Sequence, residues 1–383
     1  MQYYFDHAAS TPVHPEAVQA MLDVYTSMTG NASSTHSFGR AARQLLNRSR
    51  DCIAAQIGSS AAELVFTSGG TESDNAAIAG AAYAMRNRGK RHIITTAVEH
   101  HAVLHTCEAL EEEGFRLTIL PVDEYGIVAP ADVEAAIEPD TALISVIYVN
   151  NETGTIQPIA EIGEIARRRG VLFHVDAVQA LGSMPIDLRT LPVDLMSFSA
   201  HKVNGPQGVG ALYISRHTPF HPIIHGGSQE RKRRAGTENL AGIAGFSKAV
   251  ELSVKNMAAR KLFLDELRLR WVECLQAMAQ TSSIVVNGHP SQYVPNIINV
   301  SFIGVDTETM LMNLDLEGIA ASSGSACTAG ALEPSHVLHA MGLPAERLQS
   351  AVRFSFGLGN TMEEIEIAAK KIETILRRVR TTA

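Results

Sequence analysis

The sequence predicts an α/β protein with a large domain, built on a mostly parallel sheet flanked by helices, and a smaller α+β domain. Short apolar runs alternate with segments of helical periodicity up to about residue 257, which is typical of a sheet covered on both faces. The length of 383 residues exceeds what one core usually supports, so two domains are expected. We expect residues 13–257 to form the large domain, and residues 1–12 together with 258–383 to form the small one.

Helix start and stop signals and apolar periodicity predict the individual elements. Pro12 and Pro15 mark the start of a helix over residues 16–28. A second helix begins near Phe38, and Gly58 stops it. Strands are then expected at 64–67, 93–96, 116–120, 143–149, 171–175, 195–199 and 210–214, with one helix ending near residue 88 and others at about 101–113, 130–137 and 159–169. The remaining elements are a helix over about 242–280, strands at 284–286 and 297–302, and helices at 307–318 and 363–380.

The charge balance argues against nucleic acid or a membrane as a direct partner. A formal net charge of −8 and a pI near 6.0 leave no basic field of the kind that both partners require. The basic run at 231–234 is interpreted as a solvated loop, with phosphate binding as the alternative. No apolar run approaches the roughly 20 residues of a bilayer span, and the first residues do not resemble a secretion signal. A cytoplasmic location is therefore expected.

The four cysteines are scattered and form no CxxC pair, so neither a zinc site nor a disulfide framework is predicted. Cys52, Cys107 and Cys274 lie inside helical patterns, where a free cysteine is usually a small inert hydrophobe. Cys327 lies instead in a run of small residues, 322–330, which predicts a mobile surface loop. An exposed thiol is easily oxidised, so its presence there favours a chemical role.

Two strand ends indicate pyridoxal phosphate. Lys202 follows strand 195–199 and precedes a glycine-rich run, an arrangement that suits an amine held near an aldehyde. Asp176 ends another apolar run and offers the anion that a protonated pyridine nitrogen requires. Gly70 and Thr71 stand where a strand gives way to a helix, whose free amides make a phosphate cradle. Each signal is weak alone, but all fall at the strand ends where α/β sheets bind ligands.

Motifs along essentially the whole chain resemble those of the cysteine desulfurases, the NifS/IscS-like branch of class V aminotransferase-fold enzymes that use pyridoxal phosphate. The matching segments are 4–12, 30–36, 68–72, 99–101, 149–154, 174–179, 197–202, 226–230, 234–239, 322–328 and 352–355. The resemblance implies the pyridoxal-phosphate-dependent aminotransferase fold, fold type I. It also implies a homodimer that acts on L-cysteine.

The resemblance assigns roles around the cofactor ring. Lys202 would bond to the cofactor and then move a proton at the substrate Cα, and Asp176 would pair with the pyridinium nitrogen. Gln179 would reach the ring hydroxyl, while His100 would stack on the ring as an acid or base. The adjacent His101 is interpreted as an ordinary helix-start residue.

The resemblance also assigns phosphate and substrate contacts. Asn151 would lie near the ring hydroxyl and the substrate, and Thr237 would reach the phosphate of the neighbouring subunit. The residues expected to hold the phosphate within one subunit are Gly70, Thr71, Ser199 and His201. The residues for which we expect only helix capping and surface roles are Ser73, Asp74 and Asn75.

Arg353 and Cys327 identify the substrate and the reaction. Arg353 suits bidentate capture of an amino-acid carboxylate, with an ion pair to an acid of the small domain as the alternative. Cys327, in a long loop at about 322–334, would take the substrate sulfur as a persulfide. It would pass that sulfur to an acceptor protein, such as an iron–sulfur scaffold, a tRNA-thiolating enzyme or a cofactor-synthesis protein.

Two other functions remain open at this stage. A selenocysteine lyase, or another class V lyase or aminotransferase, would use the same cofactor. A non-catalytic sulfur or iron–sulfur scaffold would use the cysteines alone, and their dispersal argues against it.

Overall fold

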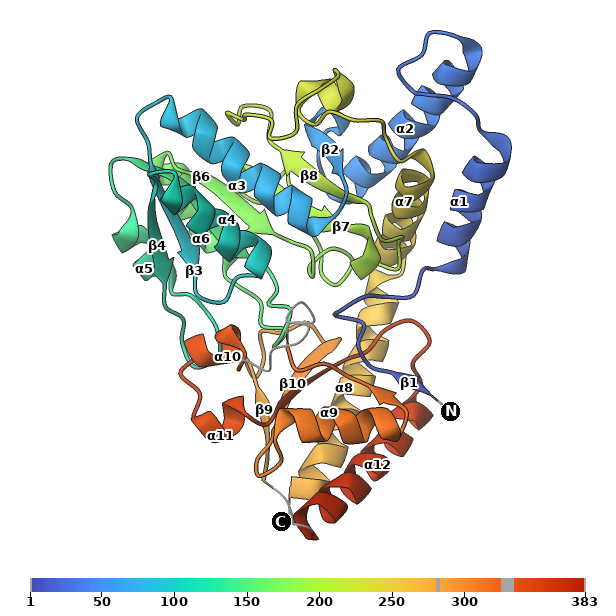
Figure 1. Ribbon diagram of the computed structural model, residues 1–383, viewed down its shortest axis with the longest axis vertical. Helices are drawn as coiled ribbons and strands as arrows, with labels where there is room; N and C mark the ends of the chain where they lie inside the picture. Colours follow the sequence, from blue (N-terminus) through green and yellow to red (C-terminus); the bar gives the residue numbers. More distant parts are fainter. Residues whose placement is uncertain (1, 280–282, 325–333, 382–383) are drawn as a thin grey trace.

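A computed structural model describes residues 2–279, 283–324 and 334–381. Two layered units stack along the long axis in Figure 1, with a large sheet in the upper one and a small sheet in the lower one. Helix α8 (Met257–Ala279) belongs to the lower unit, and the chain enters it directly from α7 (Leu240–Lys255) of the upper unit. The predicted domain bounds, 13–257 and 258–383, stay a prediction.

The large sheet has seven strands in the order β2-β8-β7-β6-β5-β3-β4. Its strands are β2 (Leu64–Thr67), β3 (His92–Thr96), β4 (Arg116–Leu120), β5 (Thr141–Ile147), β6 (Leu172–Asp176), β7 (Leu195–Ser199) and β8 (Gly210–Ile214). Only β8 among these seven runs antiparallel to its neighbours β2 and β7. The carboxyl ends of the other six strands therefore meet at one edge of the sheet.

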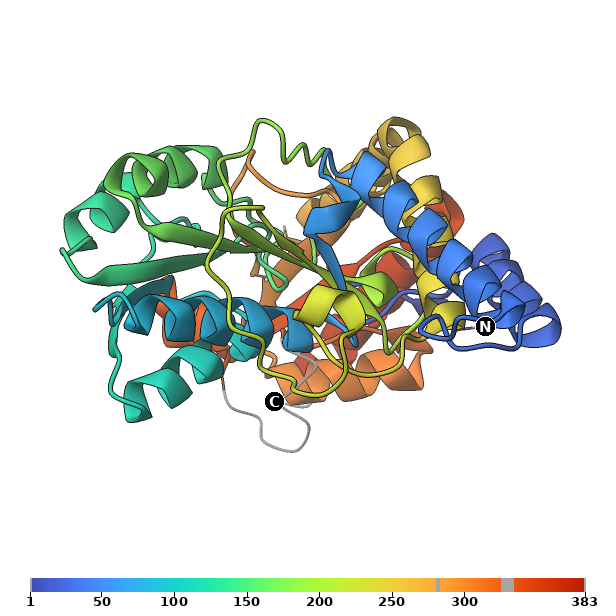
Figure 2. The same cartoon turned by 90° about the horizontal axis from the view of Figure 1, so that it is seen from above.

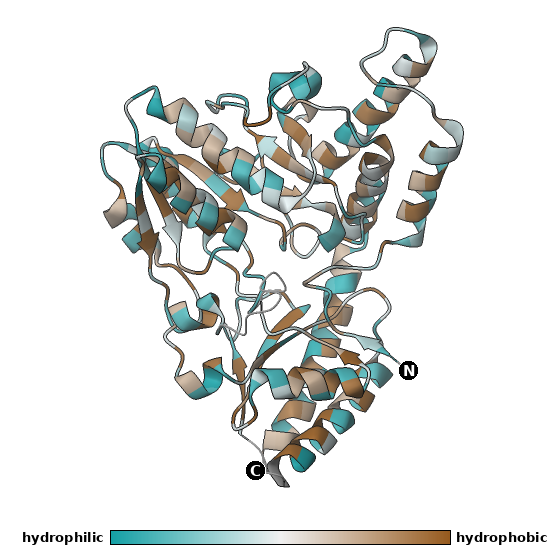
Figure 3. Ribbon diagram, in the orientation of Figure 1, coloured by the Kyte–Doolittle hydropathy of each residue, from teal (hydrophilic) through white to brown (hydrophobic). Residues whose placement is uncertain are grey.

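Helices cover both faces of this sheet. The helices of this unit are α1 (Pro15–Ser27), which packs against α7, and α2 (Ser37–Gln56), α3 (Gly70–Arg86), α4 (His101–Glu112), α5 (Pro130–Ala136), α6 (Ile159–Arg169) and α7, with short 3-10 turns at Ala61–Glu63, Ala200–Lys202 and Gln229–Lys232. Figure 2 shows α3 and α4 on one face and α6 on the other. Adjacent strand residues point to opposite faces, so Leu195 packs in one apolar cluster and Met196 in the other. This burial explains the continuous apolar runs of the sequence, which Figure 3 shows as brown strands.

The lower unit is a three-stranded antiparallel sheet with helices packed against it. Its elements are β9 (Ile284–Asn287), β10 (Ile297–Phe302) and β12 (Ala351–Ser355), with helices α8, α9 (Thr307–Leu316), α10 (His336–Ala340), α11 (Ala345–Leu348) and α12 (Met362–Thr381). Its core surrounds the fully buried Trp271. The amino-terminal segment joins it, because β1 (Tyr3–Tyr4) pairs with β11 (Ile319–Ala320) and Phe5 packs edge-on against Trp271.

The single helix expected over 242–280 is wrong, because the segment forms the two helices α7 and α8. Asn256 separates them with non-helical backbone angles, φ −99° and ψ 5°. Phe246 of α7 belongs to the core of the large sheet, and Trp271 of α8 belongs to the core of the small one. One straight helix could not present both apolar faces to two different cores. The expectations also omitted β12, α10 and α11.

None of the helices within the described residues combines the length and the apolar character that crossing a bilayer requires. The predicted helical positions of three cysteines are confirmed, because Cys52, Cys107 and Cys274 lie in α2, α4 and α8, with Cys107 buried. The solvated loop predicted for the basic run at 231–234 is only partly confirmed, because Arg231 and Lys232 are exposed in a 3-10 turn, whereas Arg233 and Arg234 are half-buried and Arg234 pairs with Glu72 at 2.8 Å.

Candidate active site

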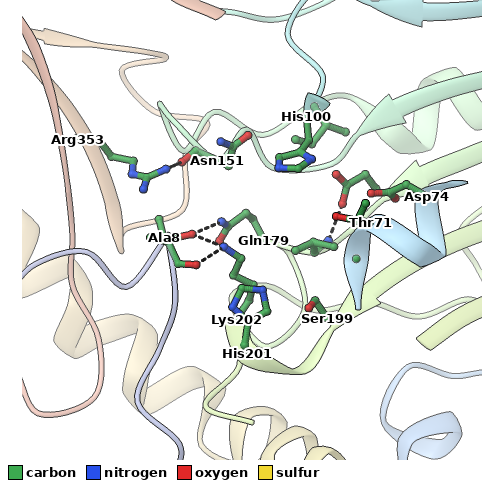
Figure 4. A pocket seen from close by; sticks show the side chains of 15 residues that line it. Ala8, Thr71, Asp74, His100, Asn151, Gln179, Ser199, His201, Lys202 and Arg353 are labelled. Atoms are coloured by element: carbon green, nitrogen blue, oxygen red, sulfur yellow. Dashed lines mark hydrogen bonds between the residues drawn. The ribbon is translucent and has the colours of Figure 1, made fainter. Parts of the chain in front are cut away.

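A cavity of about 180 Å³ opens at the carboxyl ends of the parallel strands (Figure 4). Its lining residues are Ala8, Ala9, Gly70, Thr71, Asp74, His100, Ile147, Asn151, Asp176, Val178, Gln179, Ser199, His201, Lys202 and Arg353. The fold thus brings together every predicted site residue except two. Thr237 lies exposed in the loop before α7 and does not line the cavity. Cys327 lies outside the described residues.

Lys202 stands in the short 3-10 turn directly after β7. Its Nζ donates hydrogen bonds to the carbonyl oxygens of Ala8 and Ala9, the latter at 2.8 Å. The amino-terminal segment, whose Tyr3 and Phe5 pack in the core of the small sheet, therefore holds the amine inside a cavity of the large one. Carbonyl groups that accept from an amine orient it without neutralising it.

Asp176 is the last residue of β6 and is buried. Burial raises the pKa of its carboxyl to about 6, while a hydrogen bond from the Val178 N–H, at 2.9 Å, and the charge of Lys202 act in the opposite direction. Gln179 Nε2 donates to the Ala8 carbonyl at 3.0 Å. Asp176 is thus a buried acid that carries its charge near neutral pH.

The amino terminus of α3 forms a small concave site beside Ser199. A Cβ at Gly70 would lie 2.8 Å from Val178 Cγ2, so the close approach of these segments requires glycine. The first turn of α3 has no side-chain cap, which leaves backbone N–H groups without a side-chain partner where Gly70 and Thr71 line the cavity. The Ser199 hydroxyl is buried and has no hydrogen-bond partner among the described residues. Free amides and an unpaired hydroxyl suit an anion such as a phosphate.

Two histidines of the site are uncharged at neutral pH. Burial, with the nearby charge of Lys202, lowers the pKa of His100 to about 4 and that of His201 to about 4. His100 caps α4, and its Nδ1 accepts from the Ala102 N–H at 3.1 Å, so the ring proton is assigned to Nε2. His101 is the first residue of α4, as predicted, and its ring lies 4.5 Å from that of His336.

Arg353 projects from β12 of the small sheet and is only 1% exposed. Its Nη1 donates to the Asn151 carbonyl at 2.9 Å, and its Nη2 donates to Asp6 at 3.0 Å. Its Nε has no hydrogen-bond partner within the described part of the chain. The ion pair to an acid, which the sequence left as the alternative, is therefore present, and the same guanidinium also lines the cavity.

Comparisons with known proteins place this chain and its fold in one family. The sequence profile described as aminotransferase class-V matches residues 3–367. The chain belongs to the class-V aminotransferase family. A cysteine desulfurase IscS of Methanosarcina thermophila is 48% identical over 98% of this chain and 92% of its own length. A solved NifS-like protein superposes with a TM-score of 0.93 at 37% identity, over 99% of this chain and all of its own.

A third relative of this class-V chain is a solved structure described as SspA in complex with cysteine. It has a TM-score of 0.81 and 35% identity over 93% of this chain and 99% of its own. These matches over nearly the full length show that the predicted fold, the aminotransferase fold with a mostly parallel sheet and a smaller α+β part, is correct.

The prediction of surface roles for Ser73 and Asp74 is wrong. Both side chains are buried, at 0% and 1% exposure, and Asp74 lines the cavity. Ser73 donates to the Gly69 carbonyl at 2.9 Å, and Asn75 donates to the Thr71 carbonyl at 2.9 Å, so neither acts as an N-cap. Polar residues at a helix start favour a cap in sequence, but here α3 buries this turn against β6 and β7.

Sequence reasoning also missed the backbone groups of Ala8 and Ala9. Their carbonyls hold Lys202 and Gln179, yet any residue other than alanine would offer the same acceptor. Only the matching segment 4–12 pointed to this region of the chain.

Proposed function

We propose that this protein is a cysteine desulfurase, which converts L-cysteine to L-alanine and holds the released sulfur as a persulfide on Cys327. The observation that carries the proposal is the convergence of Lys202, Asp176 and Arg353 on one cavity. An amine, a buried acid and a guanidinium are the groups that a pyridoxal-phosphate enzyme needs for an amino-acid substrate. The near full-length likeness to proteins named cysteine desulfurases supports this choice of reaction.

The residues present fit pyridoxal phosphate. Lys202 would bond to the cofactor aldehyde, and Asp176 would pair with the ring nitrogen. The unpaired Ser199 hydroxyl and the free amides of α3 would receive the phosphate. When bound, the cofactor supplies an electron sink for the pair left at the substrate Cα.

The side chains of this chain would then bind the substrate and move its protons. Arg353 would bind the cysteine carboxylate, because Asp6 and the Asn151 carbonyl already orient its guanidinium. Lys202 would take the proton from Cα. His100 is neutral near pH 7, so it can accept a proton and return it.

The sulfur step balances without an external oxidant. The Cys327 thiolate would attack the substrate sulfur, forming an S–S bond while the substrate C–S bond breaks. The electron pair of the broken bond goes to the substrate Cβ, which takes a proton and becomes the methyl group of alanine. One thiol and one cysteine thus yield one persulfide and one alanine.

We also propose that the enzyme works as a homodimer, in which Thr237 of each subunit reaches the phosphate held by the other. Thr237 is exposed in this chain, as such a contact requires. The acceptor would be a protein, an iron–sulfur scaffold or a tRNA-thiolating enzyme, since the net charge of −8 disfavours direct tRNA binding. The cytoplasmic location stays a prediction.

A Cys327→Ser variant tests the reaction. It should keep the yellow colour of the bound cofactor but lose alanine production from cysteine, measured with a reductant present to release the persulfide. Lys202→Ala is the matched control and should lose the colour. Alanine formation by Cys327→Ser at the wild-type rate would contradict the persulfide route. Parallel kinetics with selenocysteine and with an α-keto acid acceptor separate the lyase and aminotransferase alternatives.

A further inference from the structure

Asp74 is a second buried carboxyl group in the cavity that already contains Asp176, and the proposed reaction assigns it no role. It projects from the first turns of α3 and is 1% exposed. Figure 4 shows it beside Thr71, on the opposite side of the cavity from Arg353. Its Oδ1 has no hydrogen-bond partner among the residues that the structure describes. A buried polar atom left without a partner is costly, so its chemical state requires an explanation.

A chain of buried side chains leads from Asp74 into the sheet. The Ser197 hydroxyl is hydrogen-bonded to the Asp74 carboxyl and lies 2.9 Å from His174 Nε2. His174 Nδ1 lies 2.8 Å from the Ser145 hydroxyl. His174 Nε2 itself is 3.6 Å from Asp74 Oδ1, which is too far for a good hydrogen bond. Ser197 therefore connects the acid to the imidazole.

Among the described residues no positive charge faces Asp74, and the hydrogen bond with Ser197 is what opposes the rise in its pKa. The titratable groups facing it within the described segments are His174 and Asp176 of β6 and Glu99 after β3. Burial lowers the pKa of His174 to about 3, so this imidazole is neutral. Asp176 and Glu99 are themselves acids. Burial and the nearby Asp176 raise the pKa of Asp74 well above its ordinary value.

Asp176, unlike Asp74, has a backbone hydrogen-bond donor and a nearby positive charge. It accepts the Val178 N–H at 2.9 Å, and the charge of Lys202 acts on it. Two neighbouring buried carboxyl groups in a poorly polarisable site do not both ionise, and the charge goes to the one with the better donors.

We propose that Asp74 is a positioning residue that stays protonated in the working enzyme, so that Asp176 is the only anion facing the ring nitrogen. This proton also sets which group donates in each hydrogen bond between Asp74 and Ser145. Asp74 donates to the Ser197 hydroxyl, Ser197 donates to His174 Nε2, and the ring proton of His174 resides on Nδ1, facing Ser145. An ionised Asp74 would reverse the direction of donation in each of these hydrogen bonds. The role at the ring nitrogen rests on the proposed function, whereas the protonation of Asp74 does not.

Asp74→Asn tests this assignment, because an amide keeps the shape and the donor of a protonated carboxyl. Infrared difference spectra of the purified enzyme at neutral pH should lose the C=O band of a protonated acid. The pH at which the bound cofactor changes colour should be unchanged. Asp176→Asn is the matched control and should shift that pH or abolish cofactor binding.

Two results would overturn the proposal. The first is loss of carboxylate bands in Asp74→Asn, together with a fall of the colour-change pH by about one unit, a tenfold change in the proton equilibrium. The second result comes from the wild-type enzyme and so does not depend on the folding of an Asp74 variant. It is a ¹⁵N spectrum, with the His174 signals assigned through His174→Gln, that shows the imidazole proton of His174 on Nε2. Both measurements are made without cysteine, so a failed desulfurase assay leaves their outcome unaffected.

Discussion

The buried ion pair between Arg50 and Glu230 provides a quantitative test of how the fold holds the loop that contains Thr237. Arg50 Nη1 and Nη2 each lie 2.6 Å from a Glu230 carboxylate oxygen, and the two side chains are 5% and 2% exposed. The Phe66 N–H of β2 also donates to Glu230, at 2.9 Å. Glu230 begins a run of three residues with positive φ, 46°, 58° and 65°, which L residues rarely adopt. The side-chain pair therefore holds a strained turn in place.

Glu230→Gln would leave the buried Arg50 guanidinium without its counter-charge. Removing one partner of a buried pair costs about 3–5 kcal/mol of unfolding free energy. Release of backbone strain, about 1–3 kcal/mol for each residue held in a rare conformation, offsets part of this if the turn relaxes. We expect a net loss of about 3 kcal/mol, or about 4 °C in Tm, because an unfolding entropy of about 2.1 cal/mol/K per residue amounts to about 0.8 kcal/mol/K for 383 residues.

Chemical and thermal unfolding of a double-mutant cycle measures this coupling. Arg50→Met should be destabilised as well, whereas Arg50→Met with Glu230→Met should be less destabilised than either single variant, because it leaves no buried charge unpaired. Glu138→Gln is the matched control. It breaks an exposed pair with Arg116 and should leave unfolding unchanged. A loss below about 1 kcal/mol in Glu230→Gln, the range of exposed pairs, would refute the reasoning.

Two further variants test the site. Burial raises the pKa of Glu99 to about 8, so the folded state keeps a proton that the unfolded state releases near its ordinary pKa. The stability that this proton provides is present at low pH and is lost as the pH rises toward 8. In the wild type, the free energy of unfolding should therefore fall by on the order of 3 kcal/mol between pH 5 and 8 because of Glu99. Urea unfolding of Glu99→Gln should show that this fall is absent. Arg353→Lys should raise KM for cysteine about 10- to 100-fold without changing the cofactor colour, because an ammonium cannot replace a bidentate guanidinium contact worth about 1.5–3 kcal/mol.

For each of these two predictions, one outcome would contradict it. Stability curves of Glu99→Gln and wild type that run parallel from pH 5 to 8 would show that Glu99 does not hold the proton. An unchanged KM in Arg353→Lys would mean that Arg353 serves only its ion pair with Asp6. Asp6→Asn keeps the guanidinium in the cavity and is the control, with a smaller expected rise in KM.

Much of the fold and most of the site could be predicted because local signals agreed with the tertiary structure. The runs that became β5, β6 and β7 are mainly apolar and almost entirely buried, since both of their faces are covered. The parallel arrangement gathers the carboxyl ends of the strands, so Asp176 and Lys202, each placed just after such a run, had to lie near one another. Arg353 and Cys327 were identified by resemblance to a family rather than by spacing.

Several features depended on contacts that no local pattern encodes. β8 runs antiparallel both to β7, which directly precedes it in the chain, and to β2, which lies far away in sequence. The break at Asn256 follows from the packing of α7 and α8 in two different cores. The ion pair of Arg353 with Asp6 joins residues 347 positions apart, and its acid lies in a segment with no helix or strand periodicity.

By itself, then, the sequence determined the layered sheet and the gathering of an amine, an acid and a glycine-rich turn at its edge, because apolar periodicity and strand ends are local properties. Only the tertiary structure decided the surroundings of each group. Asp74 looked like a solvated helix-start residue, yet it is buried beside Asp176 and His174. Ala8 and Ala9 contribute backbone carbonyls, whose role could not be inferred from the alanine side chains. Protonation and orientation depend on what surrounds a group in space, and these two properties govern the chemistry.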